Sequence, residues 1–139
     1  MSIVAAGPWV TICSYDGVDA VTLLEVHHWW AWPVVVSNGV VGVWALVAHR
    51  WPAARHPALW WSTAAAEVAI AVQVILGVAT QSSTGVEAPQ FHLFYGFVAL
   101  ITVALIYSYR QQMKDQGYLL YGFGGLFLMG LAIRAMLLA

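Results

Sequence analysis

Apolar residues dominate four stretches of this chain, and short polar segments separate the stretches. The apolar stretches cover residues 21–48, 59–79, 91–110 and 119–138. A helix needs roughly 20 consecutive apolar residues to cross the hydrocarbon core of a bilayer, and each stretch is about that long or longer. The pattern therefore predicts an all-α integral membrane protein with four transmembrane helices and the lipid bilayer as its surroundings.

The links between these stretches predict how the helices are arranged. Short links favour antiparallel packing of consecutive helices, so we expect residues 1–139 to form one four-helix antiparallel bundle. The first link carries Arg50 and Arg55, the third carries Arg110 and Lys114, and the second link, TQSSTGVEAPQ, has no basic residue. Basic loops remain on the cytoplasmic side of a membrane. We therefore expect a multi-pass protein of the cell (plasma) membrane with both termini outside.

The first 20 residues contain polar and turn-forming residues, and they lack the basic region that opens a signal peptide. Pro8, Asp16 and Gly17 are expected to interrupt this segment. Asp19 suits the N-cap of the first helix, and Pro33 removes one backbone hydrogen bond further along. The first helix is therefore predicted to begin after Asp19 and to bend near Pro33.

Composition agrees with a membrane protein and excludes other classes. The chain is 62% hydrophobic and 8% charged, whereas a soluble domain carries about a quarter charged residues. A net charge of −1 gives no electrostatic support for binding nucleic acid. A single cysteine, Cys13, excludes an internal disulfide and a thiolate metal cluster.

Polar residues with possible chemistry gather at the predicted outer ends of three helices. The stretch LLEVHHWWAW places Glu25, His27 and His28 at the start of the first span, and His92 begins the third. The fourth helix runs outward and carries Arg134 near its end. Given the expected topology, three histidines, a glutamate and an arginine should lie at one depth in the membrane.

Small residues follow these histidines at helical spacing and leave room for a flat ring. They are Gly39 and Gly42 below His28, Gly96 and Ala99 below His92, and Ala66, Ala69 and Gly77 beside Gln73 on the second helix. Two neutral imidazoles on facing helices are a common arrangement for holding haem iron.

The pattern therefore predicts a haem, which we expect to be b-type, with His28 and His92 as ligands of the iron. His27 is the alternative to His28, because adjacent helical positions point about 100° apart. Arg134 is placed to pair with the haem propionates.

A simpler interpretation stays open for each of these residues. Histidine, tryptophan and arginine are ordinary near the ends of membrane helices, and Arg134 can extend to the interface. Within the second span, Glu67 is costly in lipid unless it is paired or protonated. It is expected either to form a hydrogen bond between helices or to transfer protons.

The order of these residues resembles that of haem A synthases. The Glu25-x-x-His28 arrangement is similar to the one that opens a haem-bearing helix in that family. The segment VQVILGVATQSSTGVEAPQFHLFYGFVAL then resembles the next part, with Gln73 and a Leu-Gly pair ending one helix and His92 starting another. Over residues 25–99 the resemblance implies a four-helix half with His28 and His92 as axial ligands. It implies that Glu25 lies near the haem edge, where it would assist proton movement in a catalyst.

This chain also departs from that family. Trp29 stands where the family usually has arginine after the first histidine. Full-length members consist of two halves, and this chain has room for one, so it would have to dimerise to reproduce their arrangement. We therefore expect a homo-oligomer or membership of a larger complex, and whether the chain is an enzyme is left open.

Two functions follow from the sequence. The first is a haem-binding membrane protein of the respiratory chain, acting in electron transfer, haem handling or oxidase maturation. The alternative is an accessory or assembly subunit of a respiratory oxidase complex without its own cofactor. The alternative depends on tryptophan-rich interfaces and on four glycines of the last helix, since small residues favour association of membrane helices. These glycines are Gly122, Gly124, Gly125 and Gly130.

Overall fold

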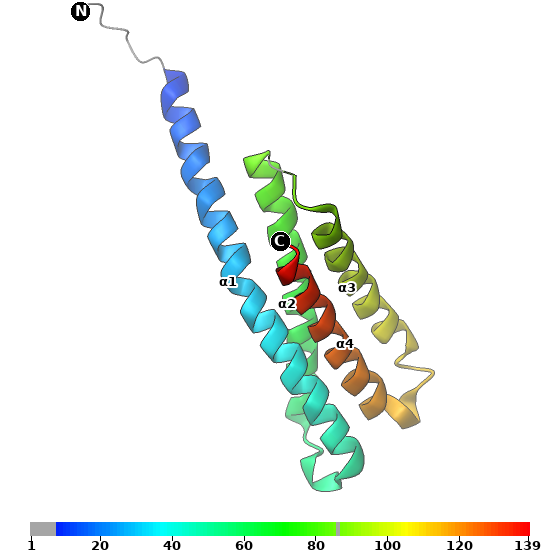
Figure 1. The fold of residues 1–139 in the computed structure, drawn as a ribbon. Helices are drawn as coiled ribbons and strands as arrows, with labels where there is room; N and C mark the ends of the chain where they lie inside the picture. The colour runs from blue at the N-terminus through cyan, green and yellow to red at the C-terminus, as the bar shows by residue number, and fades with distance from the viewer. Residues whose placement is uncertain (1–7, 86) are drawn as a thin grey trace, which may run out of the picture.

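The computed structural model describes residues 8–85 and 87–139, with side chains from residue 22 onward. Residues 1–21, in which no signal peptide is expected and which contain Cys13, have no described side chains. Four long helices form the fold (Figure 1): α1 (Pro8–Arg50), α2 (Pro57–Thr84), α3 (Gln90–Tyr109) and α4 (Gly117–Leu137). Two single-turn 3₁₀ helices, η1 (Pro52–Ala54) and η2 (Lys114–Gln116), lie in the links.

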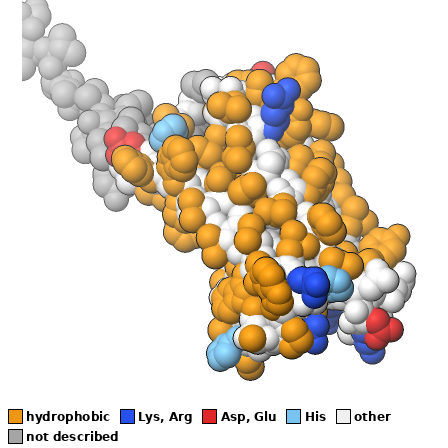
Figure 2. Space-filling model, turned by 60° about the horizontal axis from the view of Figure 1, so that its bottom comes forward, with side chains coloured by type: hydrophobic (Ala, Val, Ile, Leu, Met, Phe, Trp, Pro, Cys, Tyr) orange, Lys and Arg blue, Asp and Glu red, His pale blue; other side chains and the backbone are white. Residues whose placement is uncertain are grey.

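All four long helices are long and apolar enough to cross a membrane, as the sequence predicts. The candidate spans are Thr22–Arg50, Pro57–Thr84, Gln90–Tyr109 and Lys114–Leu137. On the face shown in Figure 2, the charged and histidine side chains lie towards the two ends, with a hydrophobic surface between them. Trp29 and Trp61 are among the exposed aromatic residues, at 72% and 79% exposure. Such a surface suits lipid and does not suit water.

The chain reverses direction at each link. In Figure 1 the α1–α2 and α3–α4 links lie at one end, and the α2–α3 link and the C-terminus lie toward the other. We name the first the arginine end, after Arg50, Arg55 and Arg110, and the second the histidine end, after His27 and His92.

The start of α1 differs from the prediction. The helix begins at Pro8 and continues through Asp16, Gly17 and Asp19, so these residues do not interrupt it and Asp19 is not its N-cap. The helix also contains Pro33 in its interior, and the predicted bend there stays a prediction. Proline is tolerated in the first turn because its missing N–H has no partner there. An established helix propagates across Asp and Gly at a cost of about 1 kcal/mol or less each.

The helix α2 extends past its apolar run into the polar segment TQSST. The four hydroxyl groups of this segment donate to carbonyls one turn earlier in the same helix. These hydroxyls belong to Thr80, Ser82, Ser83 and Thr84, at 2.8 to 2.9 Å from their acceptors. Gly85 then ends the helix with a φ of 65°, which glycine adopts without strain. The polar residues therefore belong to the helix, although the sequence pattern assigned them to the link.

Side chains close the link between α1 and α2. His56 caps α2, since the Ala58 N–H donates to its Nδ1 at 3.1 Å. Arg55 Nε donates to the Ala48 carbonyl at 2.9 Å, which satisfies an acceptor at the end of α1. Trp44 Nε1 donates to the Ala54 carbonyl at 2.9 Å. These bonds fix the turn at the arginine end.

Glycines bring α1 and α4 into close contact. A Cβ atom added to Gly42 would lie 2.9 Å from the Leu126 nitrogen and 3.0 Å from the Gly122 oxygen. A Cβ added to Gly125 would lie 2.9 Å from the backbone carbonyl oxygen of Asn38. The backbones of α1 and α4 therefore pack directly against each other. Gly122 and Gly125 are therefore buried against α1 of the same chain and are not free for a partner.

A buried amide joins α1 to α2. Asn38 is 1% exposed, and its Nδ2 donates to the Val34 carbonyl at 2.9 Å and to the Ala66 carbonyl at 3.3 Å.

Helix α3 packs unequally against its two neighbours. It makes extensive contact with α4 but only weak contact with α2. The weakly packed seam between α2 and α3 leaves space for cavities.

Candidate functional site

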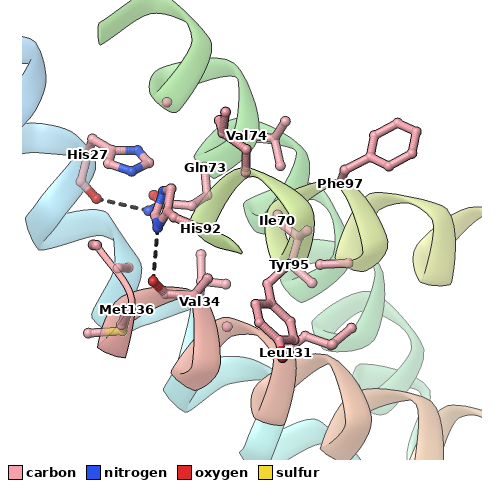
Figure 3. A pocket seen from close by; sticks show the side chains of 18 of the residues that line it. His27, Val34, Ile70, Gln73, Val74, His92, Tyr95, Phe97, Leu131 and Met136 are labelled. Atoms are coloured by element: carbon pink, nitrogen blue, oxygen red, sulfur yellow. Dashed lines mark hydrogen bonds between the residues drawn. The ribbon is translucent and has the colours of Figure 1, made fainter. Parts of the chain in front are cut away.

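A cavity of about 370 Å³ lies among the four helices toward the histidine end (Figure 3). This volume lies in the usual range for small-molecule pockets, about 300 to 1,000 Å³. Small residues from all four helices make room for it, and they include Ala31, Gly77, Gly96, Ala99, Ala132 and Ala135. Of the predicted small residues, Gly77 on the second helix and Gly96 and Ala99 on the third border this space, whereas Ala66 and Ala69 do not.

Two histidines from different helices meet at this cavity. His27 of α1 and His92 of α3 have ring centroids 5.9 Å apart, and their ring planes are inclined by 72°. Figure 3 shows the two side chains next to each other, with Gln73 of α2 beside them. Both rings are partly buried. The pair is therefore held inside the fold and does not lie at random on its surface.

The hydrogen bond of His92 determines which of its nitrogens is free. Its Nδ1 lies 2.9 Å from the Ala135 carbonyl oxygen. A carbonyl can only accept, so Nδ1 carries the proton and donates it. The other nitrogen, Nε2, then has its lone pair available. Histidines that bind metals are typically oriented in this way by a second partner.

A hydrogen bond holds the backbone of His27, whereas Nδ1 of its ring has no hydrogen-bond partner. Gln73 Nε2 donates to the His27 carbonyl oxygen at 3.0 Å. Among the described residues, His27 Nδ1 and Gln73 Oε1 are buried atoms without a hydrogen-bond partner. A buried polar group without a partner costs free energy, about 1 to 3 kcal/mol, so such atoms call for an explanation.

Gly77 provides the space for the His27 ring. A Cβ atom added to Gly77 would lie 3.0 Å from His27 Cε1, closer than such contacts normally are. One turn along α1, Trp30 Nε1 donates to the Ala69 carbonyl at 3.2 Å and ties α1 to α2. The position of the His27 ring thus depends on a glycine of the neighbouring helix.

Of the two candidate ligands on α1, the structure places His27 beside His92. His28 is exposed and borders the cavity without being the ring paired with His92. On α1, His27, Ala31 and Val34 share the cavity face. The small residues expected below His28 face elsewhere, since Gly39 and Gly42 meet α4. The rotation of α1 about its axis is therefore set by its glycine contact with α4.

The two charged residues of the predicted site lie apart from the cavity. Glu25 and Arg134 are both exposed, and neither borders it. Among the described residues that line the cavity, none is charged, so the walls are a low-dielectric surface with a few polar atoms. The predicted roles of Glu25 at a haem edge and of Arg134 with propionates stay predictions.

The imidazoles of His27 and His92 are the paired metal-binding donors at this cavity. The described residues contain no group of three or more His, Cys, Asp or Glu side chains placed to hold a metal ion. The centroids of the His27 and His92 rings lie 5.9 Å apart, so both rings could contact one bound group.

Comparisons with protein-family models, with curated proteins and with solved structures find no match to this chain.

Proposed function

We propose that this protein is a haem-binding protein of the cell membrane, in which His27 and His92 would hold the iron. The observation that carries the proposal is the histidine pair at a cavity of about 370 Å³, with His92 oriented through Nδ1 so that Nε2 is free. In this proposal the four helices form an antiparallel bundle with both termini outside, and the site lies near the outer face.

Each neighbour of the pair has a physical role in this proposal. The Ala135 carbonyl holds His92 in one tautomer, and Gln73 holds the backbone of His27. Gly77 leaves room for the His27 ring, and small residues form the walls. A haem bound here would supply one-electron redox chemistry, tuned by its two ligands and by burial.

The resemblance to haem A synthases supports a place in the respiratory chain. It favours electron transfer, haem handling or oxidase maturation as the role, and it implies that Glu25 would lie near the haem edge. It also favours association of two copies, because full-length members of that family contain two such halves. In the resemblance the ligand on α1 is His28, whereas the geometry favours its neighbour His27.

A haem titration of the purified protein tests this proposal. We expect b-type haem added to the protein in detergent to give a saturable Soret band at one haem per chain. Reduction should give the sharp visible bands of six-coordinate, low-spin iron, because both axial positions are filled by imidazole. Absence of a saturable band, or a spectrum of free haem in detergent, would contradict the proposal.

The alternative, an accessory subunit of a respiratory oxidase complex without a cofactor, has less support. Gly122 and Gly125 pack against α1, and Gly124 faces Ile106 of α3. Of the four glycines, only Gly130 faces open space. Gentle extraction would distinguish the two functions, since an accessory subunit should co-purify with oxidase subunits at a fixed ratio and without a Soret band of its own.

A further inference from the structure

A second cavity, of about 590 Å³, lies in the seam between α2 and α3 toward the arginine end. Helices α2, α3 and α4 line it, and it shares no lining residue with the histidine cavity. Its polar lining residues are Thr63, Glu67, Tyr107, Arg110 and Tyr121. The cavity exists because α2 and α3 make few contacts with each other.

Glu67 is the residue of this cavity that most needs an explanation. It lies ten residues after Pro57, which is about 15 Å along the helix at 1.5 Å per residue. It is partly buried, and among the described residues it forms no hydrogen bond or ion pair. The hydrogen bond between helices that was one expected role for Glu67 is therefore not formed. An intramembrane carboxyl group is costly, and it usually marks a functional site.

Other polar groups line the same cavity as this carboxyl group. The Arg110 guanidinium lies 4.0 Å from the centroid of the Tyr107 ring. Tyr121 also lines the cavity, and its ring packs edge-on against Trp60 with the centroids 5.4 Å apart. The Thr63 hydroxyl is already used, since it donates to the Leu59 carbonyl at 2.8 Å. One carboxyl group, one guanidinium and two phenols therefore surround the space.

The rest of the wall is apolar and includes an aromatic ring. Trp60, Ala64, Val68, Ala71 and Val103 complete the lining. An organic cation would be repelled by Arg110, and an anion would be repelled by Glu67. A neutral, flat molecule with an oxygen at each end of its ring matches both groups, because one oxygen can donate to the carboxylate while the other accepts from the guanidinium or a phenol.

We propose that this cavity binds the headgroup of a lipid-soluble quinone or hydroquinone. Such a molecule reaches the seam between α2 and α3 from within the bilayer. Its ring packs against Trp60 and the alanines, and one oxygen accepts from Arg110 or from Tyr107. The other oxygen donates its hydroxyl proton to the Glu67 carboxylate in the hydroquinone, whereas in the quinone, which has no hydroxyl, it accepts from the protonated Glu67 carboxyl group. The proposal concerns binding alone and does not depend on the proposed haem site.

Equilibrium binding of a short-chain quinone tests the proposal. The protein in phosphatidylcholine nanodiscs, without haem, is titrated with a decyl-substituted benzoquinone and with its reduced form, and binding is measured by calorimetry against empty nanodiscs. We expect saturable binding of one molecule per chain. Glu67→Leu removes the hydrogen-bonding group and Ala71→Phe fills the cavity, and each should weaken binding at least tenfold.

Two matched variants serve as controls. Glu87→Leu and Ala104→Phe change exposed residues outside both cavities and should bind as the original chain does. Circular dichroism and gel filtration check that every variant is folded. Uptake that does not saturate, or equal binding by Glu67→Leu, Ala71→Phe and the controls, would overturn the proposal. The Soret band of the same variants with haem added should be unchanged, so failure here is distinct from failure of the haem proposal.

Discussion

The positions of the two histidine side chains depend on neighbouring groups that are not themselves metal ligands. His92 is oriented by the Ala135 carbonyl, and His27 occupies space that Gly77 leaves open. The backbone of His27 is held by the amide of Gln73. A histidine without such neighbours would lose side-chain entropy on binding a ligand, so these contacts make binding more favourable.

Substitution of Gly77 tests this dependence at a single residue. Gly77→Val places a branched side chain where a Cβ alone would already lie 3.0 Å from His27 Cε1. We expect haem affinity to fall at least tenfold, which corresponds to about 1.4 kcal/mol. Haem titration followed at the Soret band measures the change. Gly130→Val is the control, because nothing lies within 4 Å of its added Cβ, and equal affinities for the two variants would argue against a fixed His27 ring.

Asn38 provides a second test at the scale of the residue. Replacing Asn38 with alanine removes the bonds to the Val34 and Ala66 carbonyls. Hydrogen bonds between membrane helices contribute about 0.6 kcal/mol on average and up to about 1.7. We expect Asn38→Ala to lower the free energy of unfolding by about 1 kcal/mol in mixed micelles. Ser37→Ala, which removes a bond within α1 only, should have a smaller effect, and the reverse order would refute this role.

At the scale of the element, the backbones of α1 and α4 contact each other directly at Gly42, Gly122 and Gly125. Gly42→Val would force a side chain against the backbone of residues 122–126, which cannot move aside as a flexible side chain can. Overpacking usually costs 1 to 3 kcal/mol, and we expect about 2 or more here. Thermal unfolding in detergent would show it, while the same change at Gly130 should leave the transition within about 1 °C.

The four spans were predictable from the sequence because length and apolar content determine membrane helices almost alone. The residues at which the helices begin and end were less predictable. α2 continues through TQSST because its hydroxyls bond to the same helix, and α1 continues back to Pro8 across residues that favour turns elsewhere. Local composition does not distinguish a polar helix end from a polar link.

Only part of the candidate site was predictable from the sequence. The three histidines placed at one depth, His27, His28 and His92, do border one cavity, whereas Glu25 and Arg134 are exposed and do not border it. The choice between His27 and His28 depends on the rotation of α1, which is set by contacts of Gly39 and Gly42 with α4. These contacts join residues that are distant in the sequence, so the pattern of apolar and polar residues along the chain cannot reveal them.

At the scale of the whole molecule, two separate cavities are each lined by α2, α3 and α4, and α1 also lines the first. One is lined by the histidine pair toward one end, and the other is lined by Glu67 toward the opposite end. Helix α1 packs extensively against α2 and α4, whereas α3 packs mainly against α4. The few contacts between α2 and α3 leave space between these two helices at both cavities.

Cysteine labelling tests the expected orientation of the molecule in the membrane. Cys13 is first replaced by serine, and single cysteines are then introduced at the exposed positions Ser83 and Gln112. Because the links that carry Arg50, Arg55, Arg110 and Lys114 should face the cytoplasm, we expect a membrane-impermeant maleimide to label Ser83→Cys on intact cells. Gln112→Cys should be labelled only after the membrane is opened, and the opposite result would invert the topology.

The most direct test of the account compares three histidine variants in one measurement. Haem-supplemented protein is purified as His27→Ala, His28→Ala and His92→Ala, and the absorbance spectrum of each is recorded. If His27 and His92 hold the iron, both of their variants lose the low-spin spectrum, while His28→Ala retains it. Retention of that spectrum in His27→Ala together with its loss in His28→Ala would contradict the ligand pair, and an unchanged spectrum in all three variants would contradict the site itself.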